Sequence, residues 1–166
     1  FLKATFEDEL RILSPNHPFA SANGEVLVSS GDYLPSIPKH QLKVFSTLRV
    51  TEKIMLSPGM TFTSKQFLRG DESNQLKKTN PYVVFNADAS WKMNNSFSFF
   101  ARIDNILDSK YETMGVLGEA DADEVNVPIS ELGDTGSGET AVGPLDPRFY
   151  SPGAPRAIFV GLRINW

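Results

Sequence analysis

The sequence has no cysteine, and it has only two histidines among its 166 residues. Without cysteine the chain can form neither a disulfide framework nor a thiolate metal site. It also lacks an apolar run of about 18 residues, so no transmembrane helix is expected. The formal net charge is only −4, which gives no indication of nucleic-acid binding. Because the chain begins with Phe1 rather than methionine, we expect it to be processed, trimmed or part of a longer protein.

The motifs of common enzyme classes are missing as well. The sequence contains no Gly-x-Ser-x-Gly nucleophile motif, no P-loop and no dinucleotide-binding fingerprint. His17 and His40 have no neighbouring metal-ligand residues, and a haem role for His17 has only weak support. We therefore expect no enzyme activity and no cofactor.

Basic residues are absent from one long stretch, which runs from Tyr111 to Pro147 and holds nine acidic residues and six glycines. This composition is typical of a solvated loop. Within it, residues 119–124 read EADADE and offer four carboxylates, the ligand type that calcium prefers. The stretch lacks the spacing and the glycine of an EF-hand loop, so we expect a solvated loop and no metal site.

What the chain does contain is alternation of apolar and polar residues with period two, the pattern of strands with two different faces. Six segments show it, and none of the chain has a convincing amphipathic helix. The six segments are residues 2–7, 41–50, 53–64, 82–92, 97–104 and 156–166. Pro58 lies inside the third segment and weakens that assignment, because proline cannot donate to a strand ladder.

The links between these segments alternate strictly between short and long. The two short links are residues 51–52 and 93–95, and the three long ones are residues 10–38, 65–80 and 105–155. An antiparallel meander with tight turns at one end and large loops at the other would have this pattern. Compact soluble domains rarely contain loops of such length, whereas outer-membrane barrels commonly combine short turns with long external loops.

The two faces of the segments also suit a membrane wall. A closed barrel pairs every backbone group between strands, so its apolar face can meet lipid. The opposite face, with Lys43, Arg49, Asp88 and Arg102, would meet a wet or plugged interior. Trp91 and Trp166 fall at the same predicted end, where aromatic girdles occur in such barrels.

Three stretches resemble TonB-dependent outer-membrane receptors, in the order in which that family has them. In GDYLPSIPKHQL the matching residues are Gly31, Leu34, Pro35, Pro38 and His40. In FFARIDNILDSKYE they are Asn105, Asp108 and Tyr111, although Ile106 and Leu107 replace the usual Leu-Phe pair. In the closing SPGAPRAIFVGLRINW they are Pro152, Gly153, Arg156 and Gly161.

The resemblance implies an all-β fold, an antiparallel meander of about six strands that forms the C-terminal wall segment of a large transmembrane β-barrel. Residues 1–166 would be one portion of that barrel, without the plug domain and the earlier strands. Six strands cannot close a barrel like those of the 22-stranded plugged transporters. The resemblance also implies a location in the bacterial outer membrane.

The final segment would be the seam strand of that barrel. Barrels of this kind end on a strand with a terminal aromatic residue, usually phenylalanine, which the barrel assembly machinery reads. Trp166 keeps the aromatic character of that position. The residues expected to form the lipid-facing assembly strand are Ile158, Val160, Leu162, Ile164 and Trp166.

By the same resemblance, the protein would take up a scarce nutrient, and we expect a ferric siderophore. TonB would act through the N-terminal region that this sequence lacks, and the other partners would be the extracellular chelate, outer-membrane lipid and the assembly machinery. Aromatic and arginine side chains suit anionic chelates, so the candidate ligand-binding residues are Arg148, Phe149, Tyr150 and Arg156. The alternative for these four is that they anchor the last loop onto the barrel rim.

A soluble β-sandwich module, such as a carbohydrate-binding domain, is the alternative from another functional class. It would explain the strands and the missing catalytic motifs. It would not explain the alternation of short and long links or the aromatic end. A receptor fragment should require detergent or form inclusion bodies, whereas a sandwich should be soluble and monomeric.

Overall fold

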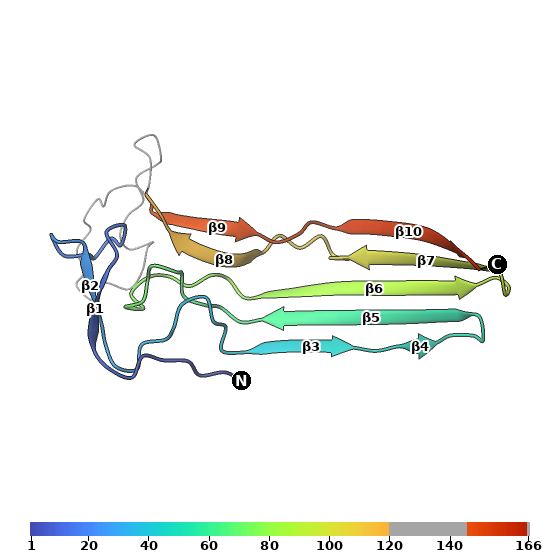
Figure 1. Cartoon of the computed structure of the whole chain (residues 1–166), viewed down its shortest axis with the longest axis horizontal. Helices are drawn as coiled ribbons and strands as arrows, with labels where there is room; N and C mark the ends of the chain where they lie inside the picture. Colours follow the sequence, from blue (N-terminus) through green and yellow to red (C-terminus); the bar gives the residue numbers. More distant parts are fainter. Residues whose placement is uncertain (120–145, 166) are drawn as a thin grey trace. The chain divides into compact units, whose positions relative to one another are not determined.

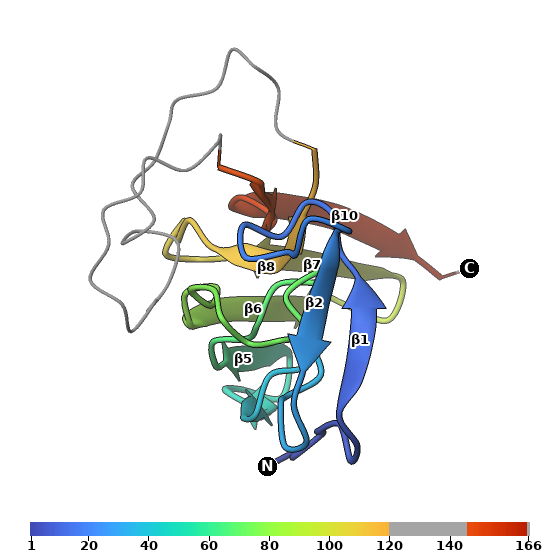
Figure 2. The ribbon, with the colours of Figure 1, turned by 90° about the vertical axis from the view of Figure 1, so that its left-hand side faces the viewer.

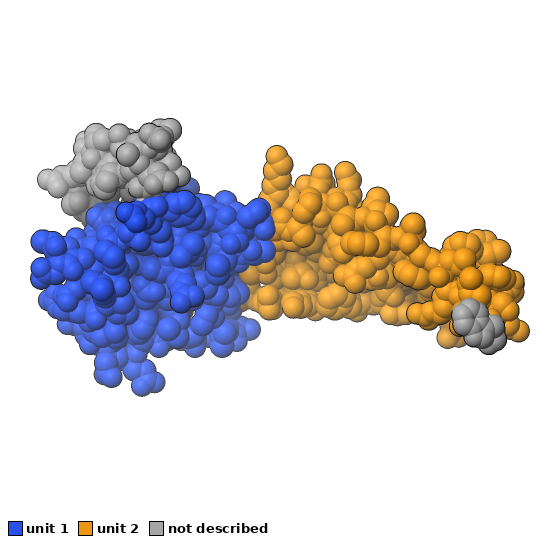
Figure 3. Space-filling view, turned by 45° about the horizontal axis from the view of Figure 1, so that its top comes forward, with its two compact units in different colours: residues 1–39, 64–80, 112–152 blue, residues 40–63, 81–111, 153–166 orange. Residues whose placement is uncertain are grey.

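The computed structural model describes residues 1–119 and 146–165, which contain β-strands and no helix. The chain divides into two compact units, shown in blue and orange in Figure 3. Unit 1 comprises residues 1–39, 64–80 and 112–152, and unit 2 comprises residues 40–63, 81–111 and 153–166. Within the described residues, no helix has the length and apolar character needed to cross a membrane.

Unit 2 is a single antiparallel sheet, which we call the wall sheet (Figure 1). Its strands are β3 (Gln41–Phe45), β4 (Leu48–Arg49), β5 (Ile54–Thr63), β6 (Tyr82–Lys92), β7 (Phe97–Asp104) and β10 (Ala157–Ile164). In the order β10-β7-β6-β5-β3, every pair except β10-β7 is consecutive along the chain once β3 and β4, which both pair with β5, are counted as one split strand. The predicted meander is confirmed for five of the six segments, and both short turns lie at one end, with the end of β10 (Figure 1).

Pro58 explains why the first wall strand is split into β3 and β4. Phe45 is opposite Gly59 and Leu48 is opposite Leu56, so both pieces share one register along β5. In the gap, the N–H of Ser46 donates to the Pro58 carbonyl at 3.1 Å. Proline has no N–H to return that bond, so the ladder is interrupted there while β5 itself continues through Pro58.

The prediction of a wall strand over residues 2–7 is wrong. This segment belongs to unit 1, where it lies along residues 30–39, with the N–H of Phe6 bonded to the Asp32 carbonyl at 2.8 Å. Only one bridge, between Thr5 and Tyr33, has strand geometry. Two prolines occur in the partner segment, at positions 35 and 38. Because proline lacks a ladder donor, the alternating segment finds no continuous partner.

The register of the wall sheet places its apolar residues on one face, which we call the apolar wall face. One row of cross-strand partners runs through Leu48, Leu56, Ala89, Ala101 and Val160. The next row runs through Ile54, Trp91, Phe99 and Leu162. Since side chains alternate along a strand, matching rows on all strands require the predicted alternation to be in phase across the sheet.

The opposite face is polar but also carries aromatic rings that cover glycines. Phe100 is the register partner of Gly161, and a Cβ on Gly161 would collide with the Phe100 ring. Phe45 is opposite Gly59 in the same way, with ring atoms 2.8 Å from where a Cβ would be. The two glycines therefore provide space for rings from the neighbouring strand, a device that also holds the register.

The connection between β7 and β10 is fixed by the side chain of Asn105, which is 2% exposed. Its Nδ2 donates to the carbonyls of Ser109 at 2.9 Å and Ala154 at 3.0 Å, and its Oδ1 accepts from the Ser109 N–H at 3.0 Å. Asn105 has a φ of 50°, a left-handed conformation that asparagine tolerates better than most residues. The side chain thus joins the turn after β7 to the chain that enters β10.

Unit 1 contains two small antiparallel sheets and a compact apolar core. Strand β1 (Leu10–Leu13) pairs with β2 (Glu25–Val28), side by side in Figure 2, and β8 (Glu112–Leu117) pairs with β9 (Arg148–Pro152). The core is formed by Leu68, Leu76 and Leu117, with Phe19 and Tyr150 packed against it. As predicted, the last long link adds no strand to the wall sheet among the described residues; its residues 120–145 lie outside them.

The contact between Gly161 and Phe100 predicts the effect of a larger residue. Gly161→Val should displace the Phe100 ring and destabilise the folded full-length protein by about 1–3 kcal/mol, the usual cost of overpacking. Phe100→Ala should remove most of that penalty in the double variant. A double-mutant cycle from urea unfolding of the protein in detergent measures the coupling, and strictly additive effects would contradict the contact.

The Asn105 side chain predicts a second stability effect. Asn105→Ala should cost about 1–3 kcal/mol, because buried backbone groups lose their partners. Asn105→Gly should cost nearly as much, since it relieves the backbone conformation but restores no hydrogen bond. Asn95→Ala, in an exposed short turn, is the control. Thermal conversion of the heat-modifiable band on gels is the readout, and an unchanged midpoint for both Asn105 variants would refute the assignment.

Candidate functional site

The apolar wall face is an extended, exposed surface of the described residues. On β10 its members are strongly exposed, with Val160 78% exposed and Ile158 65% exposed. Soluble monomers rarely expose contiguous apolar surface of this extent. Ile158, Val160, Leu162 and Ile164 lie on one exposed face of β10, while Trp166 lies outside the described residues. Their role as a lipid-facing assembly strand stays a prediction.

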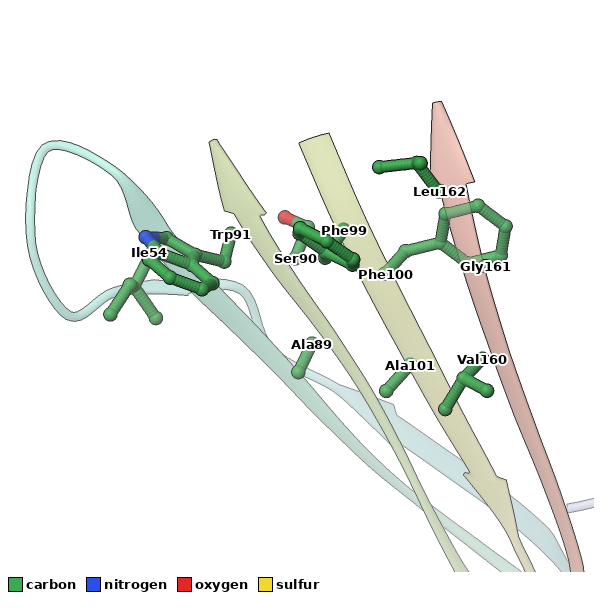
Figure 4. A pocket seen from close by; sticks show the side chains of 10 residues that line it. All are labelled: Ile54, Ala89, Ser90, Trp91, Phe99, Phe100, Ala101, Val160, Gly161 and Leu162. Atoms are coloured by element: carbon green, nitrogen blue, oxygen red, sulfur yellow. The ribbon is translucent and has the colours of Figure 1, made fainter. Parts of the chain in front are cut away.

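A hollow of about 550 Å³ opens on this face, where the side chains of Ala89 and Ala101 are smaller than those around them (Figure 4). Ala89 and Ala101 are register partners and lie between the larger side chains of Trp91, Phe99 and Val160. Trp91 and Phe99 stack with their ring centroids 6.0 Å apart. Ser90 is the only polar residue in the lining, so the hollow suits a hydrocarbon chain and offers no anchor to a charged solute.

The opposite face carries the predicted charges. Asp88 and Arg102 are cross-strand partners, and the Arg102 Nε donates to Asp104 Oδ1 at 2.9 Å. Lys43 and Arg49 share this face by register. The aromatic residues Phe45, Phe100 and Phe159 are the departure from the expected polar pattern.

Arg148, the first candidate ligand-binding residue, is held by Asp146. Its Nε and one terminal nitrogen each donate to that carboxylate at 2.7 Å, and its side chain is only 10% exposed. Partial burial would raise the pKa of Asp146, but the hydrogen bonds and charge of Arg148 hold it below its ordinary value. The guanidinium charge is therefore compensated inside the protein.

The next two candidates on β9 differ in their surroundings. Phe149 is 40% exposed, and its ring lies against Gly118. Tyr150 packs on the core leucines, and burial raises the pKa of its hydroxyl above the ordinary value. The contacts of Tyr150 and Arg148 favour the loop-anchoring alternative. Phe149 differs from them because part of its ring is exposed.

Arg156, the fourth candidate, belongs to unit 2 and is exposed. Its backbone N–H donates to Asp108 Oδ1 at 3.0 Å, and its guanidinium lies 3.8 Å from Asp108 Oδ2. Asp108 has a φ of 52° and follows Asn105 in the same turn. Arg156 thus links the chain entering β10 to that turn and leaves much of its guanidinium accessible.

The structure also shows groups that sequence reasoning missed. His17, considered weakly for haem, is buried in unit 1 with Nε2 3.2 Å from Asp71 Oδ1, and both side chains are fully enclosed. Aromatic and lysine side chains gather elsewhere in the same unit, around Tyr33 and Phe67. The His17–Asp71 pair and the Tyr33–Phe67 pair each join residues more than thirty positions apart in the sequence, so no local pattern could have predicted either group.

Metal binding receives no support from the described part of the chain. Residues 1–119 and 146–165 contain no group of three or more potential ligands among His, Cys, Asp and Glu. Most of the acidic stretch at 119–124 lies outside these residues, so the expectation of a solvated loop there stays a prediction.

Comparison with known proteins agrees with the geometry. The family model "TonB dependent receptor-like, beta-barrel" matches residues 17–106, more than half of the chain. No curated protein gives a match. The solved structures that are similar in fold include the following two. The open form of the ferric-catecholate import receptor Fiu from E. coli K12 has a TM-score of 0.53 at 16% identity over 84% of this chain.

The second is the ferric yersiniabactin uptake receptor FyuA from Yersinia pestis, with a TM-score of 0.53 at 14% identity over 86% of this chain. The present chain spans only 17% of the Fiu structure and 20% of the FyuA structure. The family match, the antiparallel wall sheet and its apolar face confirm the resemblance inferred from the sequence. The chain therefore belongs to the TonB-dependent receptor β-barrel family of the bacterial outer membrane.

Proposed function

We propose that this chain is the C-terminal wall portion of a receptor that imports a ferric chelate across the outer membrane. The observation that carries the proposal is the open wall sheet, whose apolar residues are in phase on all strands. In a soluble sandwich such a face would be buried against a second sheet, whereas here its residues are exposed, as lipid-facing residues are in a barrel wall. The two similar structures bear names of ferric chelate receptors, which supports a ferric siderophore as the cargo.

In this proposal residues 1–166 contribute wall strands and external loops, and perform no chemistry. Energy comes from TonB, which acts through the plug and N-terminal region outside this sequence. The assembly machinery inserts the barrel by reading its final strand. Among the four candidate residues, we assign ligand contact first to Phe149 and Arg156, because Arg148 is neutralised by Asp146 and Tyr150 is packed in the core.

Placement in the membrane predicts opposite responses from neighbouring residues of β10. Leu162→Arg puts a charge on the apolar wall face, which costs about 2–4 kcal/mol near the bilayer midplane. Arg163→Leu, on the opposite face, should assemble almost normally. Heat-modifiable mobility of the full-length receptor in outer-membrane fractions is the measurement. Equal assembly of Leu162→Arg and wild type would contradict the lipid-facing assignment and support the soluble β-sandwich alternative.

Transport itself is tested with radioactive iron in a strain that lacks its own ferric-siderophore receptors. Cells carrying the full-length receptor should accumulate iron from at least one class of ferric catecholate, hydroxamate or phenolate chelate, and only when TonB is present. Phe149→Ala should raise the half-saturating chelate concentration several-fold, while Phe159→Ala in the wall should not. Uptake independent of TonB, or no uptake from any class, would refute the proposed cargo.

A further inference from the structure

Unit 1 carries a cluster of lysines on a pair of stacked aromatic rings, which we call the basic platform. The rings of Tyr33 and Phe67 stack with centroids 6.4 Å apart and an interplanar angle of 22°. The Nζ of Lys39 lies 3.6 Å from the Tyr33 centroid, and the Nζ of Lys78 lies 4.1 Å from the Phe67 centroid. These cation–π contacts hold two ammonium groups over one aromatic surface.

The platform is preformed by hydrogen bonds between its two segments. Asn74 Oδ1 accepts from the Tyr33 N–H at 2.6 Å, and Asn74 Nδ2 donates to the Tyr33 carbonyl at 2.9 Å. The Ser36 N–H donates to the Phe67 carbonyl at 2.9 Å. Because these hydrogen bonds hold the two backbone segments together and the two rings stack on each other, a ligand would meet an ordered surface and lose little binding free energy to loop ordering.

The charge of the platform is poorly compensated. The positive charges of Lys39, Lys3 and Lys78 lower the pKa of Tyr33, with the hydrogen bond to Lys39 as the main cause. Burial, and then repulsion from Lys39 and Lys65, lower the pKa of Lys78. No lysine forms an ion pair within residues 1–119 and 146–165. Holding such charges together costs free energy, which an anionic ligand would recover.

One carboxylate near the platform is already occupied. Asp71 favours the charged form of Lys78, but it is fully buried. It also accepts hydrogen bonds from the Gln75 and Leu76 N–H groups and contacts His17. The charge of Asp71 is therefore largely engaged by these partners, which leaves the lysines of the platform open to an anion from outside.

The position of the platform along the chain indicates the source of that charge. One residue separates Lys39 from the start of β3, and one residue separates Lys65 from the end of β5. Both strands have their short connection at the opposite end (Figure 1). In this class of barrel the long loops are external, so these lysines adjoin the ends of wall strands that reach the outer leaflet.

We propose that the basic platform binds the phosphate groups of a phosphorylated glycolipid in the outer leaflet. Lysine is a common phosphate ligand, and its flexible stem can lie along apolar surface while the ammonium reaches a headgroup. Aromatic rings are typical of the membrane interface. A soluble chelate is also anionic, so the test has to separate these two sources.

The experiment uses the full-length receptor in detergent with two probes, lipid A that carries its phosphates and the same lipid after dephosphorylation. Native mass spectrometry measures the bound lipid. The double variant Lys39→Gln/Lys78→Gln should bind phosphorylated lipid A about 10- to 30-fold more weakly, since each basic residue near a lipid surface contributes about 1 kcal/mol. Wild type should bind the dephosphorylated lipid as weakly as the variant binds the intact one.

Controls separate this site from misfolding and from the nutrient path. Lys77→Gln/Lys53→Gln removes two exposed lysines outside the platform and should bind like wild type, as should Lys39→Arg/Lys78→Arg, which keeps both charges. Heat-modifiable mobility verifies that each barrel is folded. Equal binding of the two lipids by wild type, or loss of ferric chelate binding with unchanged lipid binding in the double variant, would overturn the proposal. Neither lipid measurement depends on transport.

Discussion

The seam between β7 and β10 depends on one buried side chain, that of Asn105. Every other neighbouring pair in the wall sheet is adjacent along the chain, whereas the long segment 105–156 separates these two strands. Asn105 uses both of its amide donors and its acceptor to hold Ser109 and Ala154. In lipid, where water cannot satisfy backbone groups, β10 contributes only if it pairs along its length. The hydrogen bonds of Asn105 place it where that pairing can begin.

The sequence predicted the parts of this fold that depend on alternation. Five wall segments were found because a sheet with one apolar face enforces period two on each strand. Residues 2–7 show the limit of this reasoning. Their alternation is equally regular, but the residues that run beside them include Pro35 and Pro38, which interrupt a ladder. A strand needs a competent partner, and the pattern of one segment carries no information about its partner.

The resemblance identifies the motif residues in the sequence, and the structure shows which contacts they make. Asn105, Asp108 and Arg156 were singled out by resemblance alone, and the structure shows that they bind one another's segments around one turn. By contrast, the sequence makes Arg148 a candidate either for ligand contact or for anchoring the last loop, and in the structure its guanidinium is paired with Asp146 two positions away. That pairing depends on how β9 is entered. Composition alone cannot show whether an arginine is available to an anionic ligand or already forms an ion pair with a carboxylate of the same protein.

The edges of the wall sheet give its geometry a further consequence. In the order β10-β7-β6-β5-β3, the outer sides of β10 and β3 have no partner strand among the described residues. An unpaired backbone group in hydrocarbon costs several kcal/mol, and an exposed edge in water promotes aggregation. Water cannot satisfy the backbone groups of these edges, because the apolar wall face favours a lipid environment. Unpaired edges have their highest free-energy cost in that environment. Only further strands in the same register can satisfy both edges and the face together, which is the physical reason that a wall of this kind functions inside a closed barrel.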